Sequence, residues 1–353
     1  MTDLRSFYRN KKVLITGNTG FKGSWMSLAL AELGADVVGV ALKPNTSPNL
    51  FSILQLDKTM RTYYSDVREL KNLLDIFEKE RPEIVIHMAA QPLVIESYNN
   101  PVYTYDVNVM GTVNVCEAVR LTSSVKSFVN VTTDKVYRNN EWVYPYRETD
   151  ALDGYDPYSN SKSCSELVTA SYIRSFLKEK NIAVSTCRAG NVIGGGDYSD
   201  NRIIPDCVRA SVNDEKIKVR NPNSVRPYQH VLEAIVFYLR LAAEQYDNPE
   251  CSGNYNIGPS DEDCLTTSEL CDIFCSDWNG AASWESINQG GPHEANFLKL
   301  DTSKIKSVFD WKPTWTADIA VKETVNWYKA YYEGTDMVEY TRKQIREFWG
   351  ENV

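Results

Sequence analysis

Lys12-Val-Leu-Ile-Thr16, followed directly by Gly17-Asn-Thr-Gly20-Phe-Lys-Gly23, is the stretch that decides the fold of this chain. An apolar run leads into a glycine-rich turn, and the apolar helical pattern of residues 25–33 comes next. Glycines three residues apart let the backbone turn sharply, approach a pyrophosphate closely and present helix N-terminal amides to its charge. The sequence therefore predicts a strand, a phosphate-binding turn and a helix, although a turn without a ligand could have the same spacing.

Apolar runs and amphipathic stretches alternate along the first half of the chain. The runs that predict strands are Val13–Thr16, Asp36–Leu42, Ile84–Met88, Ser127–Thr132 and Ala183–Arg188. Helical patterns lie near residues 21–33, 68–80, 101–121 and 156–180. This alternation predicts an α/β fold with a doubly wound, parallel, Rossmann-like sheet. The side chains and turns that we expect to converge beyond the carboxyl ends of its strands are Gly17, Ala89, Thr133 and Asn191.

From Asn191 onward the pattern loosens into glycine, proline and polar loops, which indicates a second, smaller α/β domain for the substrate. We expect residues 1–190 and a return segment of about 231–258 to form the dinucleotide-binding domain. Residues 191–230 and 259–353 would then form the substrate domain. The last helical pattern, Asp318 to Tyr332, is apolar on one side and is expected to pack.

Tyr158 and Lys162 place a phenol and an ammonium four residues apart in a helical pattern. Both side chains then project from one face of the helix. A cation beside a tyrosine hydroxyl favours the phenolate, which can remove a proton from a substrate alcohol. Such a pair also arises by chance on solvated helices, so its weight comes from the glycine turn about 140 residues upstream.

Composition limits the possible partners. The chain has 353 residues, of which 42% are hydrophobic, enough for a large core. A formal net charge of −9 argues against nucleic acid as a partner, because no basic excess is available to neutralise phosphates.

The start of the chain does not resemble a signal peptide, and no apolar run approaches about 18 residues. We therefore expect a cytoplasmic protein that does not bind membranes, and we expect it to form a homo-oligomer, a dimer or a tetramer.

Three of the eight cysteines, Cys264, Cys271 and Cys275, lie close together in sequence. None of the three histidines is near them, and Cys271 and Cys275 fall in an apolar helical pattern. This favours buried thiols in a reducing compartment over zinc ligands or disulfides. No metal site is predicted.

Further motifs accompany the glycine turn and the tyrosine–lysine pair. They are His87-Met-Ala-Ala90, Asp106-Val-Asn108-Val-Met-Gly-Thr112 and Val131-Thr-Thr133-Asp134-Lys135-Val-Tyr137. Together they resemble the extended short-chain dehydrogenase/reductase family over nearly the whole chain, and within it the nucleotide-sugar 4,6-dehydratases. Other strings are similar to the branch that acts on CDP-glucose: Thr19-Gly-Phe-Lys-Gly-Ser-Trp25, Glu141-Trp-Val, Arg188-Ala-Gly-Asn-Val-Ile-Gly-Gly-Gly-Asp197, Ile204-Pro-Asp206 and Arg226-Pro-Tyr-Gln-His-Val231.

The resemblance implies a bound NAD. The residues expected to hold it are Gly17, Thr19, Gly20, Phe21, Lys22, Gly23, Asp66, Val67, Ala89, Ala90, Tyr158 and Lys162. The second predicted strand ends in Gly39-Val-Ala-Leu-Lys43, without the acidic residue that usually binds the ribose. We therefore expect the cofactor to be bound weakly and to exchange with solvent. Asp66 is expected to contact the adenine instead. Lys43 leaves NADP open, because a cation there could meet a 2′-phosphate.

The resemblance also implies roles for five catalytic residues. Tyr158 would take the proton of the sugar C4 hydroxyl, Lys162 would hold the phenolate and the nicotinamide ribose, and Thr133 would bond the same oxygen. Asp134 matches the general acid that protonates the departing C6 hydroxyl. Lys135 stands where many dehydratases carry a glutamate, so it would either remove the C5 proton or stabilise the enolate. A surface ion pair at a strand end is the alternative for these two residues.

Substrate binding is expected in the second half, with Asn191 near the diphosphate, Arg226 on a phosphate and Arg202 as a second candidate. Arg188, at a strand end, is expected to be structural and satisfied by backbone carbonyls. The implied reaction is the dehydration of CDP-glucose by C4 oxidation, C5/C6 elimination and hydride return to C6, in the making of deoxysugars for cell-surface polysaccharide such as lipopolysaccharide O-antigen. Alternatives are a 4-epimerase or reductase, a dehydratase for another nucleotide-glucose, and a cofactor-sensing protein.

Overall fold

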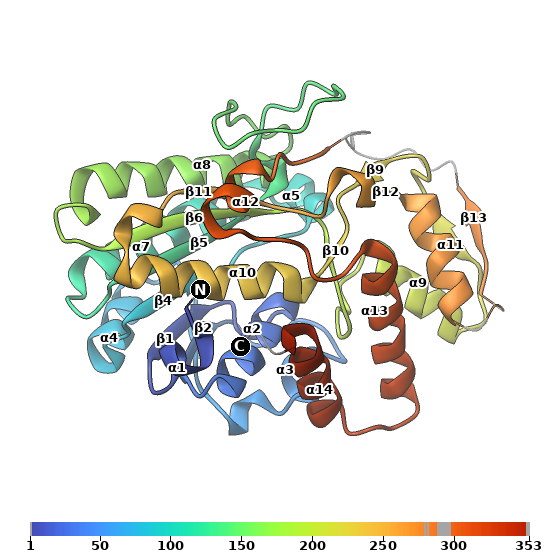
Figure 1. Cartoon of the computed structure of the whole chain (residues 1–353), viewed down its shortest axis with the longest axis horizontal. Coiled ribbons are helices and arrows are strands. Elements are labelled where there is room, and N and C mark those ends of the chain that lie inside the picture. The colour runs from blue at the N-terminus through green and yellow to red at the C-terminus, as the bar shows by residue number, and fades with distance from the viewer. Residues whose placement is uncertain (1, 279, 281, 288–297, 351–353) are drawn as a thin grey trace.

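The computed structural model describes residues 2–278, 280, 282–287 and 298–350. Its centre is a parallel sheet of seven strands in the order β3-β2-β1-β4-β5-β6-β11 (Figure 1). The strands are β1 (Lys12–Thr16), β2 (Asp36–Ala41), β3 (Arg61–Tyr64), β4 (Ile84–His87), β5 (Ser127–Thr133), β6 (Ala183–Ala189) and β11 (Asn254–Ile257). The predicted doubly wound, Rossmann-like fold is confirmed.

The helices of the described residues cover both faces of this sheet or pack beyond one end of it. They are α1 (Leu4–Tyr8), α2 (Phe21–Glu32), α3 (Leu50–Ile53), α4 (Leu70–Glu80), α5 (Val94–Asn99), α6 (Pro101–Tyr105), α7 (Gly111–Leu121), α8 (Pro157–Tyr172), α9 (Ile203–Val212), α10 (Val231–Asp247), α11 (Thr267–Trp278), α12 (Ser303–Phe309), α13 (Ala317–Tyr332) and α14 (Met337–Trp349). Val13 and Ile15 of β1 join a core with α1, α2 and α10, whereas Leu14 joins a second core with α4 and α7. Strands buried on both faces read as continuous apolar runs, which is why the sequence predicted them well.

Two predicted helices are interrupted. Residues 101–121 form α6, the π-helical turn η2 (Asp106–Met110) and α7. The turn contains the buried Asn108, whose side chain bonds the amide and carbonyl of Gln91 and the hydroxyl of Ser161. The extra residue of a π turn accommodates such side chains, and helical periodicity does not reveal it. Helix α8 likewise passes into a π turn, η4 (Ile173–Leu177), so the helix predicted to residue 180 ends earlier.

Beyond residue 190 the chain forms short strand pairs. They are β7 (Val192–Ile193) with β10 (Gln229–His230), β9 (Val225–Arg226) with β12 (Leu265–Thr266), and β8 (Ile217–Val219) with β13 (Trp284–Ser286). Helices α9, α11 and α13 pack together, beyond one end of the sheet in Figure 1. Helix α13 buries Val321, Val325 and Tyr328, so its predicted packing role is confirmed. Helix α10 and strand β11 lie with the large sheet, and α14 packs on α2, while the predicted division into two domains stays a prediction.

Candidate active site

The glycine turn joins β1 to α2 and brings the backbone close to the end of β4. Gly17 adopts a φ of +79°, and a Cβ at this position would lie 2.8 Å from the Ala89 nitrogen. A Cβ at Gly23 would lie 2.1 Å from the Gly17 carbonyl oxygen, so α2 can approach the turn only with glycine there. Gly20 is exposed and begins α2 without a side-chain cap. The turn therefore has room and helix N-terminal amides for a phosphate group, which fits a dinucleotide.

Thr19, Phe21 and the segment of Ala89 and Ala90, also predicted to hold a dinucleotide, lie in or beside this turn. The Thr19 hydroxyl donates to the Leu42 carbonyl at 2.8 Å, which ties the turn to the end of β2. The Ala89 amide donates to the Thr16 hydroxyl at 3.1 Å, which holds the segment of Ala89 and Ala90 beside β1. The Phe21 ring lies near the backbone of Gly194.

Lys22 projects from the first turn of α2 toward the centre of the site. Its Nζ lies 3.5 Å from the Tyr238 hydroxyl. Burial, together with the charges of Arg202 and Lys162, lowers the pKa of Lys22 to about 8. Three cations therefore act on one another at this place, which favours an anionic ligand.

Asp66 and Val67, expected to hold the cofactor, follow the end of β3. The Asp66 carboxylate is bonded by Arg68, with the closest contact at 2.8 Å, and Arg68 also reaches Asp106 at 2.9 Å. Burial works against ionisation, but the bonds from Arg68 lower the pKa of Asp66. Val67 is buried and packs against Gly111. The partner of Asp66 in the structure is thus an arginine, which the sequence did not predict.

Four predicted residues form one hydrogen-bonded group at the end of β5. The Thr133 hydroxyl donates to Asp134 Oδ1 at 2.9 Å. Lys135 Nζ lies 3.1 Å from the same oxygen and donates to Asn191 Oδ1 at 3.2 Å. Asp134 is fully buried, and its Oδ2 has no hydrogen-bond partner among the described residues. A buried carboxylate oxygen without a hydrogen-bond partner destabilises the folded protein. Oδ2 is therefore free to form a hydrogen bond with a substrate hydroxyl.

Tyr158 lies in the first turn of α8 and Lys162 one turn later. Thr133 lowers the pKa of the Tyr158 hydroxyl, which connects Tyr158 electrostatically to the group at the end of β5. Burial raises the pKa of Tyr158 to about 12, while Thr133 and the charge of Arg202 lower it. Lys162 Nζ donates to the Val131 carbonyl at 2.9 Å. The sequence argument expected Lys162 to favour the phenolate, but here burial dominates and the lysine is held by the strand.

The two substrate arginines occupy different places. Arg202 forms an ion pair with Asp197 at 3.2 Å, and its charge acts on both Tyr158 and Lys22, so it lies at the site. Arg226 is buried on β9, 4% exposed, and donates to the Val225 carbonyl at 2.9 Å. The weaker sequence candidate therefore has the clearer electrostatic link to Tyr158.

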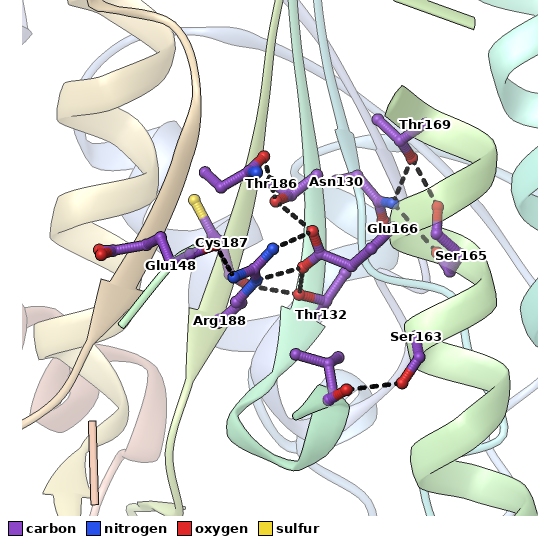
Figure 2. Close-up of polar contacts among 12 residues, drawn as sticks. Asn130, Thr132, Glu148, Ser163, Ser165, Glu166, Thr169, Thr186, Cys187 and Arg188 are labelled. Atoms are coloured by element: carbon purple, nitrogen blue, oxygen red, sulfur yellow. Dashed lines mark hydrogen bonds and ion pairs between the residues drawn. The ribbon is translucent and has the colours of Figure 1, made fainter. Parts of the chain in front are cut away.

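Arg188 has a partner that the sequence analysis missed. Its guanidinium pairs with the buried carboxylate of Glu166 at 2.9 Å (Figure 2). It also donates to the Tyr137 hydroxyl and the Glu148 carbonyl. The expected backbone partner is thus one contact, the Glu148 carbonyl, and the main partner of Arg188 is the Glu166 carboxylate. The sequence did indicate that Glu166 lies close to the site, because it comes four residues after Lys162 and projects from the same face of the helix.

The cysteines are free thiols. Burial raises the pKa of the thiol of Cys275 to about 11, and burial also raises that of Cys207, which bonds Cys271. Among the described residues, no group of three histidine, cysteine or acidic side chains is placed so that it could hold a metal ion. In that same part of the chain, no helix has the length and apolar character needed to cross a bilayer.

Known proteins resemble this chain over almost its whole length. A CDP-glucose 4,6-dehydratase of Salmonella typhimurium is 43% identical over 98% of this chain and 98% of its own. A solved UDP-glucose 4-epimerase of Thermotoga maritima with UDP-glucose aligns with a TM-score of 0.78 at 23% identity, covering 91% of this chain and 99% of its own. A dTDP-glucose 4,6-dehydratase of Bacillus anthracis in complex with NAD aligns with a TM-score of 0.76 at 21% identity, covering 93% and 99%.

At these identities the two solved structures establish the fold alone. The sequence comparison goes further, because the model of the GDP-mannose 4,6 dehydratase family matches residues 14–324. The predicted resemblance to nucleotide-sugar dehydratases is thereby confirmed. The chain belongs to the GDP-mannose 4,6 dehydratase family.

Proposed function

We propose that this protein converts CDP-glucose to CDP-4-dehydro-6-deoxyglucose and water, with NAD as its cofactor. The observation that carries the proposal is the group at the end of β5, where a buried Asp134 with one unpartnered oxygen lies beside Lys135 and Thr133. An enzyme that only oxidises or epimerises C4 has no need of this acid. The 43% identity to a CDP-glucose 4,6-dehydratase supports the choice of nucleotide.

The glycine turn, Lys22 and the segment of Ala89 and Ala90 would hold the cofactor, and Val67 and Asp66 would lie toward its adenine. Bound NAD would accept a hydride from C4 and return one to C6. Lys22, Lys162 and Arg202 place cations at the site in an otherwise acidic protein, which attracts a diphosphate there. The lack of a carboxylate at the end of β2 leaves the ribose weakly held.

Residues of α8 and of the end of β5 with the turn after it then carry out the separate proton transfers. Tyr158 removes the proton of the C4 hydroxyl, and Thr133 bonds the same oxygen while Lys162 compensates the phenolate charge. A C4 ketone acidifies the C5 proton. Lys135, as a neutral amine, removes this proton, or another base removes it while the Lys135 ammonium stabilises the enolate. Asp134 protonates the C6 hydroxyl, which leaves as water. Each transfer then occurs within the one hydrogen-bonded group at the end of β5.

Asn191, Arg202 and Arg226 are proposed to bind the substrate diphosphate. Arg202 is supported by its charge interactions with Tyr158 and Lys22. Asn191 is supported by its bond to Lys135, which brings the end of β6 to the catalytic group. Arg226 offers a planar fork that suits a phosphate. All three lie in the first part, residues 191–230, of the proposed substrate domain.

The test is to incubate the purified protein and NAD with CDP-, dTDP-, UDP- and GDP-glucose in turn. Turnover of CDP-glucose should give the alkali-induced absorbance of a 4-keto-6-deoxy sugar and the loss of one water by mass spectrometry. Asp134→Asn is the matched control, since it should abolish the loss of water. Product from another nucleotide-glucose alone would contradict the proposed substrate, and a 4-epimer of unchanged mass would contradict the reaction.

We also propose that the protein is a cytoplasmic homo-oligomer. Large apolar side chains are exposed on the mutually packed segments from α5 to η4: Tyr98, Val102, Tyr103, Tyr105, Met110, Leu121, Leu167 and Phe176. Such exposure is typical of a surface that meets another copy. The double variant Val102→Glu with Leu167→Glu should form a smaller oligomer than the wild type in sedimentation velocity. An oligomer of unchanged size would mean that the contact between copies lies elsewhere.

A further inference from the structure

Asn18, the second residue of the glycine turn, is bonded sideways to the edge strand β3 of the large sheet. It is fully buried, and its Nδ2 donates to the Thr62 hydroxyl of β3 at 3.1 Å. To reach β3, the carboxamide crosses β2 at Gly39, which pairs with Ile15 of β1 on one side and with Thr62 on the other. The turn that follows β1 is therefore fixed to a strand two places away in the sheet.

This crossing requires glycine at position 39. A Cβ there would lie 2.2 Å from Cγ and 2.3 Å from Nδ2 of Asn18, so a larger residue would displace the carboxamide. Glycine weakens the interior of a strand and often marks a place where another group approaches closely. The Asn18 Oδ1 is also unfavourable for stability, because it is buried and has no hydrogen-bond partner among the described residues. Such locally unfavourable features are typical of functional sites.

The neighbours of Asn18 in the turn are bonded to β2 and its end. The Gly17 amide donates to the Val40 carbonyl at 2.8 Å, and the Thr19 hydroxyl donates to the Leu42 carbonyl at 2.8 Å. Three successive residues of the turn are thus held by the same side of the sheet. Here β2 ends without a ribose-binding carboxylate, so cofactor affinity depends more on the phosphate turn. A turn that is ordered before the ligand arrives loses less conformational entropy on binding.

We propose that Asn18 is a positioning residue for the cofactor: by bonding Thr62 across Gly39, it holds the glycine turn in the shape that receives the pyrophosphate of NAD. It acts through the backbone of the turn, because its carboxamide is engaged at β3. The inference rests on the proposed function, in which this turn holds NAD. Loss of the bond should weaken NAD binding about fivefold, which is the net effect of one hydrogen bond.

The first experiment measures the dissociation constant of NAD by calorimetry, in protein freed of cofactor. Asn18→Ala and Thr62→Val each remove the bond and should raise Kd about fivefold, whereas Thr62→Ser keeps the hydroxyl and should bind NAD as the wild type does. Thr59→Val is the matched control, because the hydroxyl that it removes bonds the Leu56 carbonyl of its own turn. This control should leave Kd unchanged.

Urea unfolding of the same variants separates positioning from a purely structural role. Loss of packing alone would lower the free energy of unfolding and leave the Kd of the folded protein unchanged. In turnover of CDP-glucose, the KM for NAD should rise in step with Kd in Asn18→Ala and Thr62→Val, and kcat at saturating NAD should fall far less.

The second experiment uses Gly39→Ala, whose methyl group takes the place of the Asn18 carboxamide. Alone, it should weaken NAD binding at least as much as Asn18→Ala does. Combined with Asn18→Ala, it should add little, because the carboxamide that it would displace is gone. Kd of the double variant should equal that of Asn18→Ala within about twofold. If Gly39→Ala does not fold, the comparison of Thr62→Val with Thr62→Ser gives the result by itself.

The outcomes separate the two proposals. A wild-type protein that does not bind NAD contradicts the proposed cofactor, whatever the variants do. If the wild type binds NAD and both Asn18→Ala and Thr62→Val bind it as tightly, this inference alone is wrong. It is also wrong if Thr59→Val weakens binding equally, or if Gly39→Ala weakens binding as much in the Asn18→Ala background as in the wild type.

Discussion

Replacing Glu233 by glutamine should make the protein more stable at alkaline pH and leave it nearly unchanged at acidic pH. Glu233 lies in the first turn of α10, only 1% exposed, and accepts hydrogen bonds from the amides of Thr314 and Trp315 at 2.8 and 2.7 Å. Burial outweighs these bonds and raises the pKa of Glu233 to about 7, against an ordinary value of 4.5. The folded protein therefore holds this proton more tightly than the unfolded chain does.

The sign of the effect follows from this difference. Below about pH 4.5 the carboxyl is protonated in both states and costs nothing. As the pH rises from 4.5 to about 7, the unfolded chain ionises first, so the folded state loses stability. At about 1.4 kcal/mol per pH unit, the full loss is about 3 kcal/mol above pH 7. Glutamine cannot ionise, so the variant should escape this loss.

Urea unfolding of the wild type, Glu233→Gln and the exposed Glu250→Gln, from about pH 5 to pH 8, measures the effect. Any hydrogen bond lost to glutamine shifts all points equally, so only the pH-dependent part matters. The free-energy difference between Glu233→Gln and the wild type should grow by about 2 to 3 kcal/mol over this range. A difference that stays flat would refute the reasoning, as would an equal trend in Glu250→Gln.

Three further predictions concern the proposed reaction. Tyr158→Phe should fold and bind cofactor but lose at least about a hundredfold in turnover, seen as missing hydride transfer in a single-turnover absorbance trace; near wild-type turnover would exclude Tyr158 as the base. Asp134→Asn should oxidise C4 yet stall before water leaves, whereas Lys135→Met should also suppress exchange of the C5 proton with deuterated solvent; normal product carrying deuterium at C5 in the lysine variant would leave Lys135 without a chemical role. Purified protein should gain activity when NAD is added, because β2 ends without a carboxylate, and clearly tighter binding of NADP in a titration would point to Lys43 instead.

The large sheet was predictable because its signal is local and repeated. Buried parallel strands such as β5 and β6 are continuous apolar runs, and the glycine turn fixes which strand comes first. The interruption at Asn108 was not predictable, because a π turn depends on a partner, Gln91, that reaches it only in the folded chain. Helical periodicity averages over such a single inserted residue.

The site, like the fold, has features that the sequence predicted and features that it did not. The sequence placed Thr133, Asp134, Lys135 and Asn191 at strand ends, and the structure joins them in one hydrogen-bonded group. It did not predict how Lys162 is held, because a carbonyl acceptor such as that of Val131 leaves no mark in a sequence. Burial in the folded chain decides the pKa values of Tyr158, Lys22 and Lys162, so these were the least predictable property of the site.

The place of β11 in the sheet has a consequence for synthesis on the ribosome. Strand β6 ends at residue 189, but its outer neighbour β11 begins only at residue 254. While the intervening residues are being made, the outer edge of β6 lacks its partner, and an unpaired strand edge invites pairing with other chains. A nascent chain of this protein thus passes through a long interval of aggregation risk that ends only when Asn254–Ile257 emerges and closes the edge.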